Sequence, residues 1–385
     1  MWKFIVGKIE HSPKPRSALL ELPPKLQTAI ISHLIPDATS SIQSVLLTCK
    51  QLYEFALPLS VHTFRYSGCP YLDDRPPTDV YRSYVQFLRY ITVQKPELAQ
   101  HVKVLIVGWV AKCESPLPTP PGMEELAIYK TNIDAISTED THENSEAWKK
   151  LWYDELASGD GADAFIAMLL VVCKRLEELC FSSYHQHGVY NKHTGRIIHM
   201  AARWPSLPPQ VRRSIPFAPL ACLHTVYEEA EKYTHFHERD WSKCVPPIFS
   251  LPSIRSYESV MSSLINETHE TFKLLPKGSS NVQDLVFRGA CFSDTAVKSV
   301  AFACKSLRSF EYIRTRVRDR SDREDEMMPR DLLEAVLPHA GTLESLYVDF
   351  EDDSFKKRWS ENVDKTYMGV DLREMTALKS LVAGM

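Results

Sequence analysis

VQDLVFRGACFSDTAVKSVAFACKSLRSFEY, residues 282–312, is the stretch that decides the fold. Apolar residues alternate around Leu285 and again around Phe310, which predicts two β-strands. Between them, Val297 and Val300 keep helical phase behind Asp294, a residue type that fits a helix N-cap. A strand cannot bury both faces alone, whereas a helix packed against two successive strands completes a core. The stretch therefore predicts a strand, helix, strand unit.

The same order recurs along the chain, with two apolar residues three positions apart at the start of each strand. The pairs are Val102/Leu105, Leu176/Leu179, Leu223/Val226, Ile254/Tyr257, Val282/Leu285, Leu307/Phe310, Leu343/Leu346 and Leu378/Leu381. Several pairs follow one another at close to the ~20 to 29 residues of a leucine-rich repeat, and the longer separations leave room for insertions. Residues 98–385 thus resemble irregular leucine-rich repeats, although the asparagine that normally turns each repeat is missing. An ordinary α/β domain with a parallel sheet remains the alternative.

Three short helical patterns precede the repeats, between Leu19 and Leu59. The first carries Leu26, Ile30 and Leu34 at i, i+4 steps behind Pro23-Pro24, which a first helical turn tolerates. We expect Ser40 or Ser41 to cap the second helix and Pro58 to close the third. Such a segment is near the lower size limit of an independent domain, so its apolar stripes are expected to dock on something else.

These helices resemble an F-box, a helical hook that binds a Skp adaptor and so attaches a substrate receptor to a cullin-RING ubiquitin ligase. The matching residues are Leu22-Pro23-x-x-Leu26-x-x-x-Ile30-x-x-x-Leu34, then Leu46-Leu47-Thr48-Cys49-Lys50-x-Leu52-x-x-x-Ala56-x-Pro58-Leu59. The resemblance implies that Leu22, Pro23, Leu26, Ile30 and Leu34 face the adaptor, with Cys49 and Leu52 helping to form the hook. An ordinary helical cap on the following domain is the alternative.

The predicted fold class is α/β, in which a three-helix F-box-like segment precedes an irregular leucine-rich-repeat-like solenoid with parallel strands. The predicted domains are the F-box-like segment over 17–62, a helical linker over 63–97 with an amphipathic helix from Val80 to Ile91, and the repeat region over 98–385. Loop insertions are expected near 112–146, 182–219 and 314–330, because these stretches interrupt the repeat order and are rich in proline or charge.

Composition and charge narrow the functional class. The chain has 385 residues, 44% of them hydrophobic, which allows two or three globular domains. Its net charge of −4 gives no general attraction to nucleic acid or to anionic membranes, so neither is expected as a partner. The N-terminal apolar stretch is too short for a signal peptide and no segment could span a bilayer. With nine scattered cysteines read as reduced thiols, we expect an intracellular, cytoplasmic or nuclear protein.

Chemistry-bearing clusters are sparse in this sequence. His185-x-His187 with His193 and His199 is the strongest metal-like group, followed by His235-x-His237 with Cys244, but neither brings a matching carboxylate or cysteine pair. The acidic runs, such as Glu351-Asp352-Asp353, and the arginines from Arg314 to Arg323 are best read as solvated loop charge. No nucleophile elbow or phosphate-binding loop occurs. We expect no catalytic residue, metal or cofactor.

The sequence therefore predicts a non-catalytic substrate-recognition adaptor. It would bind a Skp adaptor through its F-box and recruit an unidentified protein target for ubiquitination, because a receptor of this kind promotes the reaction by proximity. A scaffold that uses the hook outside a ligase is one rival. The other is an enzyme with a loop-built site, for example one around His185 to His199.

Overall fold

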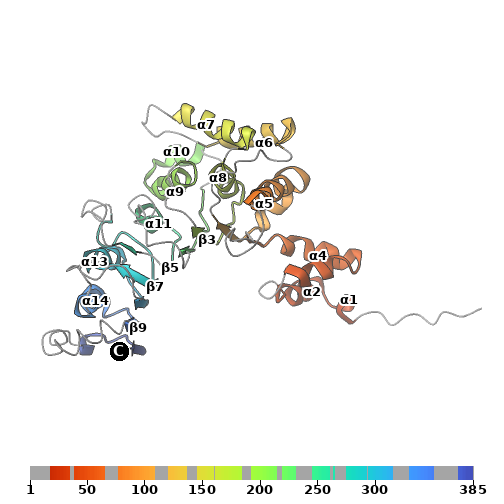
Figure 1. Ribbon diagram of the computed structural model, residues 1–385. Helices are drawn as coiled ribbons and strands as arrows, with labels where there is room; N and C mark the ends of the chain where they lie inside the picture. Colours follow the sequence, from red (N-terminus) through yellow and green to blue (C-terminus); the bar gives the residue numbers. More distant parts are fainter. Residues whose placement is uncertain are drawn as a thin grey trace, which may run out of the picture. The chain divides into compact units, whose positions relative to one another are not determined.

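The computed structural model divides the chain into two compact units, Met1–Thr63 and Phe64–Met385 (Figure 1). The residues that the structure describes are 18–34, 39–65, 77–108, 120–136, 145–159, 161–183, 192–214, 219–230, 245–260, 263–264, 275–292, 294–314, 329–350 and 372–384. All structural statements below concern these residues.

The first unit is a small helical cluster. Its helices are α1 (Ala18–Glu21), α2 (Pro24–Ser32), α3 (Thr39–Leu46) and α4 (Lys50–Ser60). Their shared core is formed by Ile31, Ile42, Leu52 and Ala56. Two boundaries differ from expectation: α3 begins at Thr39, before either predicted serine cap, and α4 continues past Pro58. A proline this close to the end of a helix removes only one backbone hydrogen bond, so the last turn can still form.

The second unit is built on a parallel sheet. Its strands are β1 (Thr63–Arg65), β2 (Val104–Gly108), β3 (Glu178–Ser183), β4 (Thr225–Ala230), β5 (Ser256–Val260), β6 (Ser263–Leu264), β7 (Asp284–Phe292), β8 (Ser309–Arg314), β9 (Ser345–Phe350) and β10 (Ser380–Gly384). The order across the sheet is β1-β2-β3-β4-β5-β7-β8-β9-β10, with β6 paired to β7. Every pair from β2 to β10 is parallel. Strands therefore follow one another across the sheet in chain order, as successive repeats of a solenoid do.

The repeat positions predicted from the sequence are found on successive parallel strands. The second residue of each apolar pair lies beside its counterpart on the next strand, in one continuous row: Leu105, Leu179, Val226, Tyr257, Leu285, Phe310, Leu346 and Leu381. All but Leu381, on the last strand, are buried. The α/β fold with leucine-rich-repeat-type stacking is thus the observed one.

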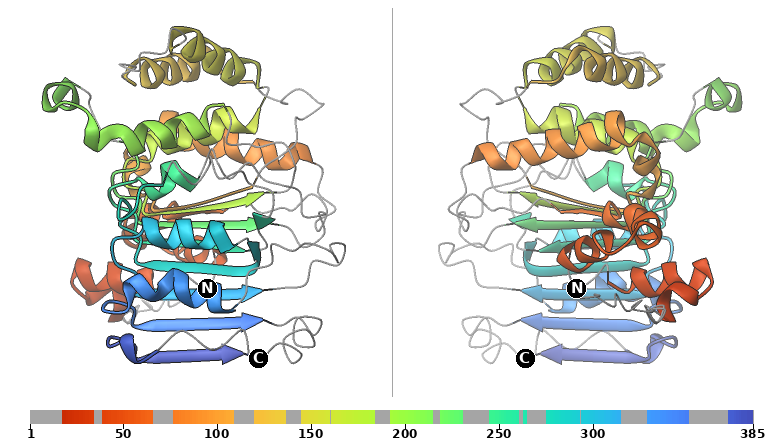
Figure 2. Two further views of the ribbon diagram at one scale, coloured as in Figure 1. Left: turned by 90° about the vertical axis from the view of Figure 1, so that its left-hand side faces the viewer. Right: turned by 90° about the vertical axis from the view of Figure 1, so that its right-hand side faces the viewer.

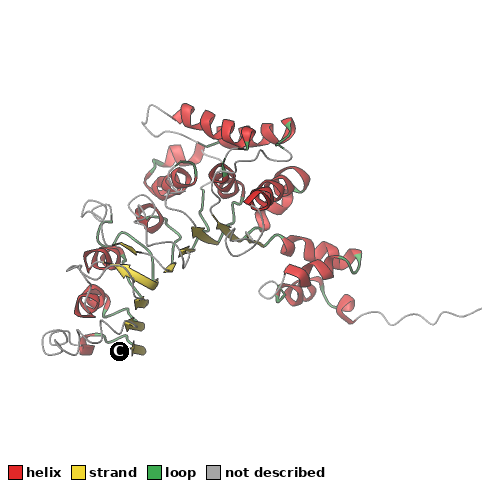
Figure 3. Ribbon diagram, in the orientation of Figure 1, coloured by secondary structure: helices red, strands yellow, loops and turns green. Residues whose placement is uncertain are grey.

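Helices cover one face of this sheet (Figures 1 and 3). They are α5 (Pro77–Arg89), the π-helical turn η1 (Tyr90–Gln94), the 3-10 helix η2 (Pro96–His101), α8 (Ala162–Val172), α9 (Thr194–Arg203), η4 (Trp204–Ser206), α10 (Pro209–Ser214), α11 (Val245–Phe249), α13 (Asp294–Ala303), α14 (Pro329–Val336), η6 (Leu337–His339) and η7 (Leu372–Glu374). Helix α8 is buried at every position except Asp163, since it is contacted by α5, α9 and two outer helices, α6 (Met123–Asp134) and α7 (Ser145–Ser158). The predicted linker helix corresponds to α5, which contacts α8 and buries Tyr84 and Leu88.

Side-chain hydroxyls tie successive repeats together just before the strands. The hydroxyl of Ser253 donates to the carbonyl of Leu223 at 2.7 Å, and the hydroxyl of Thr342 donates to that of Leu307 at 2.8 Å. Each hydroxyl belongs to the residue just before a repeat's first apolar position, and each carbonyl belongs to that first position in the preceding repeat. These bonds satisfy carbonyls of buried residues where the chain approaches each strand.

Two of the predicted loop insertions are wrong in part, because they contain helices. The 112–146 insertion holds α6 (Met123–Asp134) and the start of α7 (Ser145–Ser158), which form a layer outside α8 (Figure 2). Helix α6 buries Tyr129 and Ile133, a helical spacing that the surrounding polar sequence obscured. The 182–219 insertion holds α9 and α10. Of the 314–330 insertion, residues 315–328 lie outside the described part of the chain.

Candidate functional site: the open face of the sheet

The face of the sheet opposite the second unit's helices runs across all the strands from β2 to β10. Alternation along each strand sends every second side chain to this face, and the burial pattern of β8, in which Phe310 and Tyr312 are buried while their neighbours are partly exposed, recurs on β2, β5 and β7. Within the second unit, none of the described helices lies on this side of the strands (Figures 1 and 2). We call it the open face.

A row of five side chains crosses the middle of the open face. In strand order from β4 to β9 it reads Tyr227, Glu258, Val286, Glu311 and Tyr347, each in register with the next. All five side chains are partly exposed. We call this set the central row. It places a carboxylate on each side of Val286 and a tyrosine beyond each carboxylate.

Arg288 joins the two glutamates of the central row. It lies two residues beyond Val286 on β7, and its guanidinium bonds Glu258 at 2.6 Å on one side and Glu311 at 2.6 Å on the other. The clamp spans three strands and fixes both carboxylates. Burial raises the pKa of Glu258 above its ordinary range despite the attraction of Arg288, while bonding to Glu311 raises the pKa of Arg288. Two carboxylates thus share one cation in a half-buried setting.

Acidic residues dominate the rest of the open face. One row of open-face side chains lies two residues before the central row along each strand, and another lies two residues after it. These two rows add the carboxylates of Glu178, Asp284 and Asp349 to those of Glu258 and Glu311. Arg288 is the one cation among the described side chains of the three rows. Burial also raises the pKa of Asp284, which lies two residues before Val286. The open face therefore carries a marked excess of negative charge.

The edge where the strands begin carries balanced charge instead. One residue before each strand, Lys103 pairs with Glu177, and Glu344 pairs with both Arg308 at 2.9 Å and Lys379 at 2.8 Å. The acids of this edge are thus neutralised by cations of adjacent repeats. The sequence analysis identified neither the charged residues of the open face nor the paired charges of this edge. Their positions alternate with the buried repeat positions, so this alternation could have located them.

The predicted adaptor-contact residues of the first unit divide into two groups. Leu26 and Ile30 are 51% and 46% exposed on α2, and Pro23 and Cys49 are exposed as well. Leu52, in contrast, belongs to the unit's own core. Leu22 is partly exposed, and Leu34 packs against that core. The structure thus brings Pro23, just before α2, and Leu26 and Ile30, on α2, to the surface.

A side chain that the sequence reading missed holds this region in place. Gln27 is almost fully buried beside Leu26, and its amide donates to the carbonyls of Leu20 and Leu22 at 3.2 and 2.6 Å. Its amide oxygen accepts a bond from Gln51 of α4 at 3.2 Å. A buried amide with three partners fixes the chain that leads into α2. The side chain of Leu26, next to Gln27 on the same helix, is exposed.

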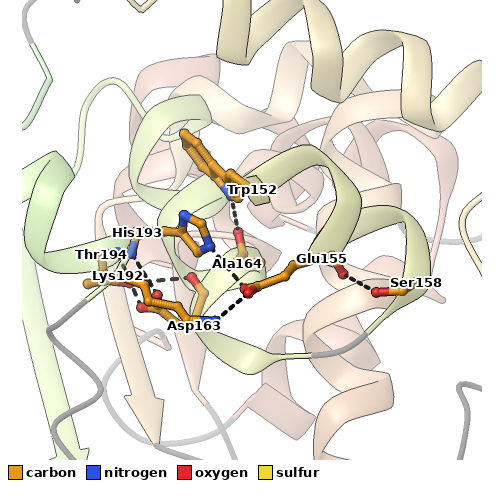
Figure 4. A network of polar contacts seen from close by, with 8 residues as sticks. All are labelled: Trp152, Glu155, Ser158, Asp163, Ala164, Lys192, His193 and Thr194. Atoms are coloured by element: carbon orange, nitrogen blue, oxygen red, sulfur yellow. Dashed lines mark hydrogen bonds and ion pairs between the residues drawn. The ribbon is translucent and has the colours of Figure 1, made fainter. Parts of the chain in front are cut away.

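The second unit also contains a buried polar network (Figure 4). His193 is fully buried, stacks on Trp152, and places Nε2 2.9 Å from a carboxylate oxygen of Glu155. Asp163 accepts the backbone N–H groups of His193 at 2.8 Å and of Thr194 at 3.2 Å, where α9 begins. Burial lowers the pKa of His193, so the neutral ring donates through Nε2. The network ties α7 and α8 to the start of α9.

The histidines predicted as metal candidates do not converge within the described residues. His193 faces Glu155 in the buried network, whereas His199 is exposed on α9. His185, His187 and the group His235, His237 and Cys244 lie outside the described part of the chain. Among the described side chains no group of three or more His, Cys, Asp or Glu is arranged to hold a metal ion. None of the described helices is both long and apolar enough to cross a membrane.

Comparisons with known proteins address the second unit. A family model described as a leucine-rich repeat domain matches residues 79–384, which is most of the chain. A comparison with curated proteins found no match.

Proposed function

The chain belongs to the leucine-rich repeat domain family, and from this premise we propose that it is a two-part receptor: the open face binds a protein target, and the first unit binds a Skp adaptor of a cullin-RING ubiquitin ligase. The family membership gives the chain a role in protein–protein interaction. The target, the adaptor and the link to ubiquitination are our proposal.

The open face carries the recognition half of this proposal. Its three rows of partly exposed side chains run in register across the strands, so their spacing is fixed by the backbone rather than by flexible loops. A partner that spans several strands can contact many side chains without ordering the surface, which lowers the entropic cost of binding.

The first unit supports the adaptor half. Leu26 and Ile30 lie one helical turn apart, and both are about half exposed although they are large and apolar. Such adjacent apolar side chains on a small unit favour a protein interface, while the unit's own core of Ile31, Ile42, Leu52 and Ala56 is complete without them. The F-box resemblance names a Skp adaptor as the partner that covers them.

The test is binding of a purified Skp adaptor to the full chain. We expect the double variant Leu26→Glu and Ile30→Glu to lose binding, because it places two charges in the apolar contact. It should stay folded, since neither residue belongs to the core. The matched control is Lys25→Glu with Ala29→Glu, which changes two exposed residues one position earlier on the same helix and should retain binding. Equal binding by both variants would overturn the assignment of this surface.

A further inference from the structure

We propose that the central row binds an extended basic segment of the partner protein, in which two Lys or Arg side chains three residues apart meet Glu258 and Glu311. This inference rests on the proposed use of the open face as the recognition surface, and adds the chemistry of what binds there.

Charge is the first reason. Glu258, Asp284 and Glu311 surround Val286; Arg288 pairs with the two glutamates, and Arg308, one residue before β8, attracts Asp284 while it also pairs with Glu344. A partner with cations relieves the remaining repulsion, whereas an acidic partner or a nucleic-acid backbone increases it. The pKa of Glu258 and of Asp284 is raised by burial, in keeping with carboxylates that solvent does not fully stabilise.

Geometry is the second reason. Glu258 and Glu311 lie on strands separated only by β7, so their backbones are about 9.6 Å apart at the usual strand spacing. A polyproline II segment rises about 3.1 Å per residue and repeats every three residues, which puts side chains i and i+3 on one face about 9.3 Å apart. A segment lying across the strands therefore presents its cations in step with the two glutamates.

The tyrosines are the third reason. Tyr227 and Tyr347 end the central row beyond the two glutamates, about 19 Å apart by the same strand spacing. Aromatic side chains pack against the proline rings of a polyproline II segment, and the faces of their rings attract nearby cations. Arg288 also fixes both carboxylates before binding, so less side-chain freedom is lost when a ligand arrives.

The experiment measures binding of fluorescein-labelled peptides to the full chain by anisotropy. The probe carries Lys-Pro-Pro-Lys between flanking prolines. Of two comparison peptides, the partner peptides, one replaces both lysines by glutamate and the other moves the lysines to adjacent positions. We expect the probe to bind in a salt-sensitive manner and the two partner peptides to bind about tenfold more weakly or worse.

The variant Glu258→Gln with Glu311→Gln should weaken probe binding about tenfold or more, because it removes both carboxylate charges with little change of shape. The matched control is Glu177→Gln with Glu344→Gln, which removes two paired acids from the strand-start edge of the same sheet and should leave binding unchanged. Equal binding of the lysine and glutamate peptides, or equal loss in both variants, would overturn the inference. Binding of the Skp adaptor is measured in parallel with the same variants. If adaptor binding is lost in the Leu26/Ile30 variant but not in the two glutamate variants, the proposed function stands even if the basic probe does not bind.

Discussion

Replacing His339 by phenylalanine tests whether buried polar contacts stabilise the repeat stack. His339 is 5% exposed, its Nδ1 accepts the N–H of Leu307 at 3.4 Å, and its Nε2 lies 2.9 Å from the carbonyl of Ala301. The ring thus connects three successive parts of the solenoid: α13, the start of β8 and η6. The variant His339→Phe leaves the buried N–H of Leu307 without this partner, at about 1 to 3 kcal/mol, whereas the carbonyl of Ala301 still accepts the N–H of Cys304 at 3.1 Å. We expect the free energy of unfolding to fall by about 1 to 3 kcal/mol at pH 7.5.

The pH dependence gives a sharper result. Burial lowers the pKa of His339 below its ordinary value of 6.5, so the unfolded chain takes up a proton more readily than the folded one. Stability from this residue is therefore complete above pH 6.5 and is lost as the pH falls through that value towards the folded pKa. The loss is about 1.4 kcal/mol for each unit by which the pKa is lowered. Phenylalanine does not titrate, so the difference between wild type and variant should shrink from pH 7.5 to pH 5.5.

Urea unfolding at the two pH values measures this difference. The buried His193 is present in both proteins, so its own titration cancels in the comparison. The control variant His33→Phe changes an exposed histidine at the end of α2 and should shift the unfolding free energy by no more than about 0.5 kcal/mol at either pH. A difference between wild type and His339→Phe that is identical at pH 7.5 and pH 5.5 would refute the assignment of His339 as a neutral, buried bridge.

Two further predictions concern the same unit. The variant Phe310→Ala should lower the unfolding free energy by about 3 to 5 kcal/mol in urea titrations, because Phe310 is fully buried in the row that joins successive strands. A loss below about 1 kcal/mol would contradict the continuous core. The variant Asp163→Ala should speed amide hydrogen exchange in the first turn of α9, since it removes the carboxylate that accepts the N–H groups of His193 and Thr194; unchanged exchange there would show that this cap is not stabilising.

The repeat core was predictable from sequence because it depends on a local pattern. Leu285 and its counterparts stand three positions after another apolar residue, and this spacing survives even where the repeat length varies. The helix α6 was missed for the opposite reason. Its buried face includes Glu125, which is 4% exposed and accepts a bond from Arg89 at 2.8 Å, and a carboxylate at an inner position breaks the apolar pattern.

The candidate site was only partly predictable. Alternation shows which residues leave the core, but the alignment of Glu258 with Glu311 across β7 depends on the register of strands far apart in the chain. The clamp by Arg288 needs side-chain geometry that no local pattern contains. On the first unit, the F-box resemblance singled out Leu26 and Ile30 from local spacing alone, while the buried Gln27 between them carried no apolar signal.

A bridging experiment with purified components tests the two-part receptor most directly. The Lys-Pro-Pro-Lys probe is fixed to beads, and retention of a Skp adaptor is measured with and without the full chain. The account predicts that the adaptor is retained only when the chain is present, and that retention is lost with either the Leu26/Ile30 or the Glu258/Glu311 double variant. Beads that hold the chain but never the adaptor would contradict it.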